Sequence, residues 1–265
     1  NLSLALQSDF VQIFGSFKDI ILAKFNSKSK PLRVGSIGAI AEMVEGMKEA
    51  NPYSEELLQI FSDKLANDKS IEVKGNAAYG IGLIIQYSSV DLSSTYPHIL
   101  QLLFQLLNKV DKKAGSIDDE EAKDVVNRSY ANACGCVSRM ILKHEQSVPL
   151  EHVLPTLLAH LPLETGLEEN TPIFEVIIKL YGSNNELIVN QTPKIVEIFA
   201  GAFKADAERI KLINESTLGR EENIDSLKQF SSDDLKNRVV ELLKYLDQKF
   251  SGVVSSNEIL KSVVA

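Results

Sequence analysis

A short segment of small and apolar residues recurs along the chain at a spacing near 40 residues. Residues 33–44 align with 74–85 at an offset of 41, and 74–85 align with 130–141 at an offset of 56. In each pair, small residues fall on small residues and apolar residues on apolar ones. A fourth copy, around 176–181, follows about 40 residues later. Because repeated units bury a continuous core only against their neighbours, this period predicts a stack of repeats.

A second series of segments lies between these copies and has the pattern of amphipathic helices. Apolar residues recur at three- and four-residue intervals in SEELLQIFSDKLAND, YPHILQLLFQLLNKV, LEHVLPTLLAHLPL and TPKIVEIFAGAFK. Two alternating helix types with one period predict a two-helix repeat. A period near 40 is typical of HEAT and armadillo repeats, whereas tetratricopeptide and ankyrin repeats are shorter. Pro97, Pro155 and Pro193, near the starts of the last three segments, favour the HEAT type.

The predicted fold is therefore an all-α solenoid, a superhelix of about five HEAT repeats that forms a single array over residues 1–265. First helices are expected near 10–25, 54–66, 95–109, 150–161 and 190–204. Second helices are expected near 31–50, 71–87, 120–144, 168–181 and 233–249. Two polar stretches are predicted as insertions, an acidic one over 111–123 and a polar one over 206–232. Since glycine weakens a helix, the glycines of the second helices predict closely packed backbones.

The composition is that of a globular protein without a membrane span. Of 265 residues, 44% are hydrophobic and 24% charged, and no stretch approaches the roughly 20 apolar residues that cross a bilayer. The chain begins at Asn1 and opens with no secretory-signal pattern, so we expect a fragment of a longer protein. The net charge of −8 disfavours nucleic acid as a direct ligand and favours basic partners, although solubility alone explains such acidity equally well. Cys134 and Cys136, two apart in a predicted helix, cannot bridge each other and suggest a reducing compartment.

No pattern in the chain predicts catalysis, a cofactor or a metal. The chain lacks a phosphate-binding glycine loop, and Gly80-Ile81-Gly82 lies inside an apolar segment that is predicted to be helical. The four histidines have no metal-ligand spacing. The two cysteines occupy positions that hold alanine and glycine in the aligned repeat, which favours inert core thiols. Pairs of carboxylates occur in several places, but charge runs are usually solvated faces or first-turn residues of helices. The chain is therefore predicted not to be an enzyme.

Five polar side chains in or beside the second helices form the predicted binding site. The second helices of such a solenoid line its concave side, so their outward residues face a bound partner. Asn76 and Asn132 stand at equivalent positions among alanines and glycines, and Tyr79 follows the first by three residues. Glu168 and Glu169 open the next second helix. The amides would bind the backbone of an extended peptide, and the carboxylates and the tyrosine would bind a lysine. In the alternative interpretation, the asparagines bond between helices and the glutamates cap one of them.

These segments resemble the importin-β family of karyopherins, in the importin-four-like class that imports histones and ribosomal proteins. The resemblance extends from about residue 10 to about residue 250. It is clearest in GNAAYGIG at 75–82, in YANACGC at 130–136, and in VLPTLLAHLPLE at 153–164 with Glu168-Glu169-Asn170 following. The resemblance implies a nuclear import receptor that shuttles between cytoplasm and nucleus, of which this chain is a C-terminal fragment.

The same resemblance implies what the chain binds. A cargo surface is expected on the acidic concave side, where lysine-rich nuclear localisation signals of histones or ribosomal proteins would contact Asn76, Tyr79, Asn132, Glu168 and Glu169. Contacts with Ran-GTP and nucleoporins are expected mainly in the missing N-terminal part, and no direct contact with nucleic acid or membrane is expected. The alternative is a HEAT-repeat scaffold subunit of the phosphatase-regulatory type, which would hold other folded proteins through the loops within its repeats.

Overall fold

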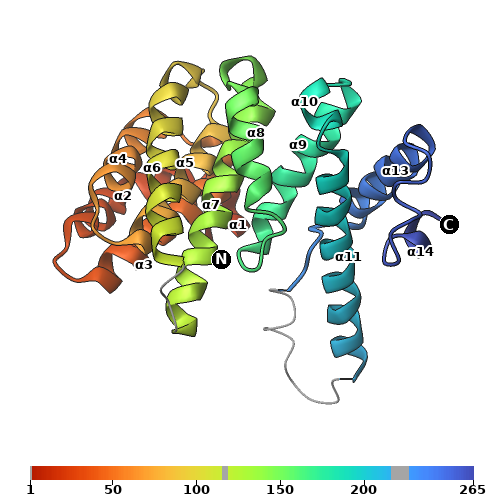
Figure 1. Ribbon diagram of the computed structural model, residues 1–265. Helices are drawn as coiled ribbons and strands as arrows, with labels where there is room; N and C mark the ends of the chain where they lie inside the picture. Colours follow the sequence, from red (N-terminus) through yellow and green to blue (C-terminus); the bar gives the residue numbers. More distant parts are fainter. Residues whose placement is uncertain (1, 115–118, 216–226) are drawn as a thin grey trace. The chain divides into compact units, whose positions relative to one another are not determined.

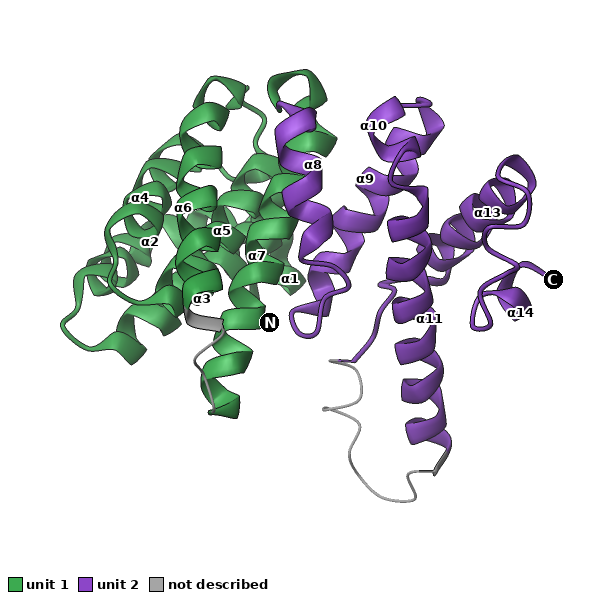
Figure 2. Cartoon of the chain, viewed as in Figure 1, with its two compact units in different colours: residues 1–148 green, residues 149–265 purple. Residues whose placement is uncertain are grey.

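The computed structural model describes residues 2–114, 119–215 and 227–265, and every regular element in these ranges is a helix (Figure 1). The predicted all-α class, with HEAT-type helical pairs, is confirmed. The chain divides into two compact units, residues 1–148 (unit 1) and 149–265 (unit 2) (Figure 2). A single array over the whole chain remains a prediction. No helix within the described ranges is long and apolar enough to cross a membrane.

Unit 1 contains three helical pairs preceded by a short helix. Its helices are α1 (Leu2–Leu6), α2 (Phe10–Leu22), α3 (Lys30–Met47), α4 (Ser54–Asn67), α5 (Ile71–Tyr87), α6 (Tyr96–Ala114) and α7 (Glu120–His144). Each first helix packs on the second helix of its pair: α2 on α3, α4 on α5 and α6 on α7. The second helices also pack side by side, α3 against α5 and α5 against α7, while α4 lies next to α6. Unit 1 therefore has a first-helix layer and a second-helix layer.

The central helix α5 has a sequence that lets its neighbours approach closely. Residues 80–85 are all buried. A methyl group added at Gly80 would lie 2.1 Å from the ring of Phe61 on α4, and one added at Gly75 would lie 2.7 Å from Oγ of Ser129 on α7. Glycine destabilises a helix by about 1 kcal/mol relative to alanine, so the close packing of these neighbours offsets that cost. The glycines of α5 are therefore contact points between helices.

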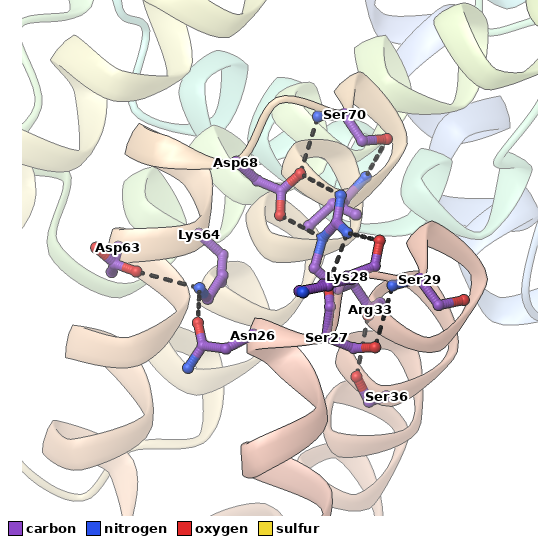
Figure 3. A network of polar contacts seen from close by, with 11 residues as sticks. Asn26, Ser27, Lys28, Ser29, Arg33, Ser36, Asp63, Lys64, Asp68 and Ser70 are labelled. Atoms are coloured by element: carbon purple, nitrogen blue, oxygen red, sulfur yellow. Dashed lines mark hydrogen bonds and ion pairs between the residues drawn. The ribbon is translucent and has the colours of Figure 1, made fainter.

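A polar network, the Arg33–Asp68 clamp, ties the start of α3 to the end of α4 (Figure 3). Nε of Arg33 donates to Oδ2 of Asp68 at 2.8 Å, and Nη1 of Arg33 donates to the carbonyl of Ser27 at 2.9 Å. Oδ1 of Asp68 accepts from the backbone N–H of Ser70 at 2.8 Å, just before α5. Burial raises the pKa of Asp68, but the hydrogen bonds from Arg33 and Ser70 and the charges of Arg33 and Lys64 outweigh burial and hold the pKa below its usual value. One ionised carboxylate thus joins two repeats.

Unit 2 has its aromatic core between α9, α11 and α13. Its helices are α8 (Leu150–Ala159), α9 (Asn170–Gly182), α10 (Glu186–Val189), α11 (Thr192–Glu215), α13 (Asp233–Lys249) and α14 (Lys261–Val264). The ring of Phe174 on α9 lies 5.2 Å from that of Phe199 on α11 and 5.6 Å from that of Phe230. Phe230 in turn lies 5.0 Å from Phe203, one turn further along α11. Because α9 also packs against α13, these rings hold α11 and α13 to α9.

The helix α11 is longer than predicted. A first helix was expected over 190–204, but α11 continues well beyond it, so the polar insertion predicted over 206–232 begins inside a helix. Asp206 is only 4% exposed, and it accepts a hydrogen bond from Nζ of Lys236 on α13 at 2.6 Å. The polar composition indicated a loop, but this ion pair lets charged residues lie on a packed helix. Residues 216–226 lie outside the described residues.

The acidic stretch predicted as an insertion over 111–123 is partly helical. The helix α6 continues to Ala114. Asp119 caps α7, because its Oδ2 accepts from the backbone N–H of Ala122 at 2.9 Å. Acidic residues at this end of α7 also interact favourably with the helix dipole. Residues 115–118 lie outside the described residues.

Gly80→Ala is expected to lower the free energy of unfolding by about 1–3 kcal/mol, because the new methyl group collides with the buried ring of Phe61. Gly35→Ala is the matched control, since no atom lies within 4 Å of a methyl group there. The control is expected to stabilise α3 by up to about 1 kcal/mol. Urea denaturation followed by circular dichroism measures both, and equal effects of the two substitutions would contradict the close approach of α4 and α5.

Asp68→Asn is expected to lower the free energy of unfolding by about 2 kcal/mol at neutral pH, because Arg33 loses its ionised partner. The folded pKa lies below the unfolded value of about 3.9, so the contribution of this carboxylate is complete above that value and is lost as the pH falls through the folded pKa. Urea denaturation from neutral pH to about pH 3 is therefore expected to show a steeper loss for the unmodified chain than for Asp68→Asn.

The control for the clamp is Asp63→Asn, which changes an exposed carboxylate in the same polar network (Figure 3). This substitution is expected to change the free energy of unfolding by less than about 0.5 kcal/mol. If Asp68→Asn and the unmodified chain lose stability in parallel as the pH falls, the clamp does not hold an ionised Asp68.

Candidate peptide-binding surface

The two predicted asparagines form hydrogen bonds between successive second helices. Nδ2 of Asn132 on α7 donates to the carbonyl of Gly75 on α5 at 3.1 Å. Nδ2 of Asn76 on α5 donates to the carbonyl of Val34 on α3 at 3.4 Å. In both cases the accepting carbonyl lies one position before the residue that aligns with the asparagine in the preceding repeat. The two hydrogen bonds therefore recur from repeat to repeat, and we call them the amide ladder. Asn132 is 4% exposed, whereas Asn76 is half-buried.

This amide ladder matches the structural alternative considered for the asparagines. A backbone carbonyl within a helix has a second lone pair and can accept a further hydrogen bond from a side chain. The amides therefore bind one helix to the next, and their recurrence among small residues follows from the short distance between helix backbones.

Tyr79 lies one turn after Asn76 on α5 and is half-buried. The guanidinium of Arg139 on α7 lies 5.8 Å from the centre of its ring, and Nε of Arg139 donates to Oε1 of Gln86 at 2.8 Å. The chain itself thus places a cation against the tyrosine that was predicted to contact a lysine. A cargo lysine at Tyr79 would have to approach the ring from another side or displace the arginine.

An acidic stripe on α3 was missed in the sequence prediction. Glu42 and Glu45 lie one turn apart on α3, and Glu49 follows in the short 3-10 turn after it. Burial raises the pKa of Tyr87 at the end of α5, and the charges of Glu45 and Glu49 raise it further, while Arg139 lowers it. Glu45 and Glu49 therefore lie close enough to Tyr87 to act on the charge of its hydroxyl. The three- and four-residue spacing of the glutamates was the signal that could have revealed the stripe.

Glu168 and Glu169 lie in unit 2, in a 3-10 turn immediately before α9. The turn follows Gly166, which has a positive φ of 66°. The two side chains differ: Glu168 is exposed, whereas Glu169 is fully buried. Asn170, the first residue of α9, donates to Oε1 of Gln229 at 3.1 Å. Of the predicted glutamate pair, only Glu168 therefore presents its carboxylate to solvent.

The structure thus brings three of the five predicted residues, Asn76, Tyr79 and Asn132, to neighbouring positions on α5 and α7 of unit 1. The two glutamates belong to unit 2. Both cysteines are buried inside α7, as expected for core residues. Within the described ranges no group of three or more histidine, cysteine, aspartate or glutamate side chains could hold a metal ion.

Comparison with known proteins relates the chain to nuclear import receptors. No protein-family model matches it. It is 27% identical over 256 residues to the probable importin subunit beta-4 of Schizosaccharomyces pombe, an alignment that covers 96% of this chain and 21% of that protein. It is 25% and 24% identical over 191 residues to importin-4 of Homo sapiens and of Mus musculus, covering 71% of this chain and 16% of each relative. The chain therefore spans about a fifth or less of the length of these curated relatives. The resemblance predicted from its sequence is confirmed: the chain is similar to importin-β family karyopherins of the importin-4 class.

Proposed function

We propose that the chain is the C-terminal, cargo-binding part of a nuclear import receptor and that it binds lysine-rich nuclear localisation signals, such as those of histones and ribosomal proteins. Its role is binding, not catalysis, in a receptor that shuttles between cytoplasm and nucleus. The similarity to importins supports the receptor role. The observation that carries cargo binding is the acidic stripe of Glu42, Glu45 and Glu49 at the end of α3, of which Glu45 and Glu49 lie near Tyr87 of α5.

The chemistry of this surface suits a lysine-rich segment. An exposed ion pair contributes about 0–1 kcal/mol, and an ammonium over a tyrosine ring about 0.5–2 kcal/mol. No single contact is strong, so binding requires several lysines that engage several carboxylates at once. The net charge of −8 adds a long-range attraction for such a segment. Glu168 of unit 2 supplies a further exposed carboxylate.

We further propose that the receptor contacts Ran-GTP and nucleoporins mainly through parts outside this chain. The chain spans about a fifth or less of the length of the importins it resembles, which leaves most of such a receptor outside it.

The test is the affinity of a fluorescent histone-tail peptide rich in lysine, measured by anisotropy at low and moderate salt. Glu45→Gln/Glu49→Gln is expected to weaken binding about 5–30-fold, because two ion pairs are lost. Glu151→Gln/Glu197→Gln is the matched control, since it removes the same charge from exposed positions of unit 2 outside the proposed surface. Binding is expected to weaken with salt. Equal weakening in both double variants, or no binding by the unmodified chain, would exclude the proposed surface.

A further inference from the structure

A groove of about 430 Å³ lies within unit 2, between α11 and the short helix α14. Both of its walls belong to the chain and carry apolar side chains, with charged side chains of α11 and α13 along the edges. None of the residues of the proposed cargo surface lines it. The groove therefore separates two apolar surfaces of one compact unit.

The wall on α11 is an apolar stripe, the α11 stripe, formed by Phe203, Ala207 and Ile210. Their spacings of four and three residues place them on one face of the helix. Phe203 is only 8% exposed, because its ring lies in the aromatic core, whereas Ile210 is 42% exposed. The α11 stripe therefore runs out of the core onto the surface, where its last residue is not covered.

The opposite wall is formed by Ile259 and Val263, which also lie four residues apart and so on one face. Ile259 is 39% exposed and Val263 is half-buried. Exposed apolar side chains that gather in one place indicate a surface that another surface covers. Here the nearest apolar surface to the α11 stripe is the face of α14 across the groove.

The segment that leads to α14 is fixed at its base to α13. Oδ1 of Asp247 accepts from the backbone N–H of Val254 at 2.9 Å and from that of Ser255 at 2.7 Å. The hydrogen bond from Ser255 is the main reason that the pKa of Asp247 is lowered. The chain reverses at Gly252, whose φ of 81° favours glycine, and Val254 is fully buried. The base of the segment is therefore held in one place.

The far end of the segment is held by one side chain. Leu260 is fully buried, while Lys261 and Ser262 beside it are exposed. Asn257 caps the turn, since its Oδ1 accepts from the N–H of Ile259 at 3.0 Å and from that of Leu260 at 3.2 Å. α14 is thus a single turn with its own local hydrogen bonds and one buried anchor. Such a turn moves as a unit more easily than a long packed helix.

We infer that α14 is a strap that closes onto α11. A rotation about the buried side chain of Leu260 brings Ile259 and Val263 onto the α11 stripe and displaces water from both apolar walls. The structure shows the open state, in which the groove is accessible, and in the closed state the chain itself fills the groove. This conformational change lies wholly within unit 2 and does not depend on the proposed recognition of lysine.

Disulfide trapping in the whole chain tests the closure. Ala207→Cys/Val263→Cys places one thiol on each wall and keeps the side chains of Ile210 and Ile259. The matched control is Leu212→Cys/Val263→Cys, because Leu212 is exposed on α11 but lies outside the groove. The chain's own cysteines are buried and are common to both variants. After mild oxidation, mass spectrometry is expected to find the 207–263 disulfide in most molecules and the 212–263 disulfide in few.

A further substitution separates closure from simple proximity of the two thiols. Ile259→Ser in the Ala207→Cys/Val263→Cys background is expected to slow disulfide formation about 3–10-fold, because the closed state loses an apolar contact. Leu212→Ser in the same background is expected to leave the rate unchanged. The inference is overturned if the 207–263 disulfide does not form, if both cysteine pairs react equally, or if Ile259→Ser leaves the rate unchanged. A disulfide between two copies of the chain in place of the internal one also overturns it.

Discussion

The close packing of α5 against its neighbouring helices is the constraint on which unit 1 depends. At Gly80 the ring of Phe61 occupies the space that any side chain would need, and at Gly75 the hydroxyl of Ser129 does so. The same short distance allows the amides of Asn76 and Asn132 to reach carbonyls on the preceding helix. Small residues and bridging amides are therefore two consequences of one spacing between helices.

The charged residues of unit 1 fall into two groups. Some are used within the chain, as in the Arg33–Asp68 clamp and the contact between Lys18 and Glu56. Others, such as Glu42 and Glu49 of the acidic stripe, carry negative charge on exposed positions.

The repeat period was sufficient to predict the helical pairs, because small and apolar residues recur wherever helices must pack on two sides. The repeat period was less informative where a polar segment of the sequence forms a packed helix. The extension of α11 was missed because a buried Asp206 paired with Lys236 looks in sequence like part of a loop.

The candidate site was predictable only in part, for a related reason. Equivalent positions in the repeats revealed Asn76 and Asn132, but equivalence alone cannot tell a ligand contact from a bond between helices. Glu169 is buried next to an exposed Glu168, a difference that neighbours in sequence do not reveal. The stripe that includes Glu45 was visible as a helical spacing, yet its proximity to Tyr87 depends on how α3 packs against α5.

Native-state hydrogen exchange of the whole chain tests the central constraint most directly. The backbone amides of residues 80–85 on α5 are expected to exchange only through global unfolding, so that their protection matches the free energy of unfolding measured by urea denaturation. The exposed end of α11, residues 210–214, is predicted to exchange much sooner. If the α5 amides exchange through local opening as fast as those of 210–214, the close packing of α5 against its neighbours does not hold unit 1 together.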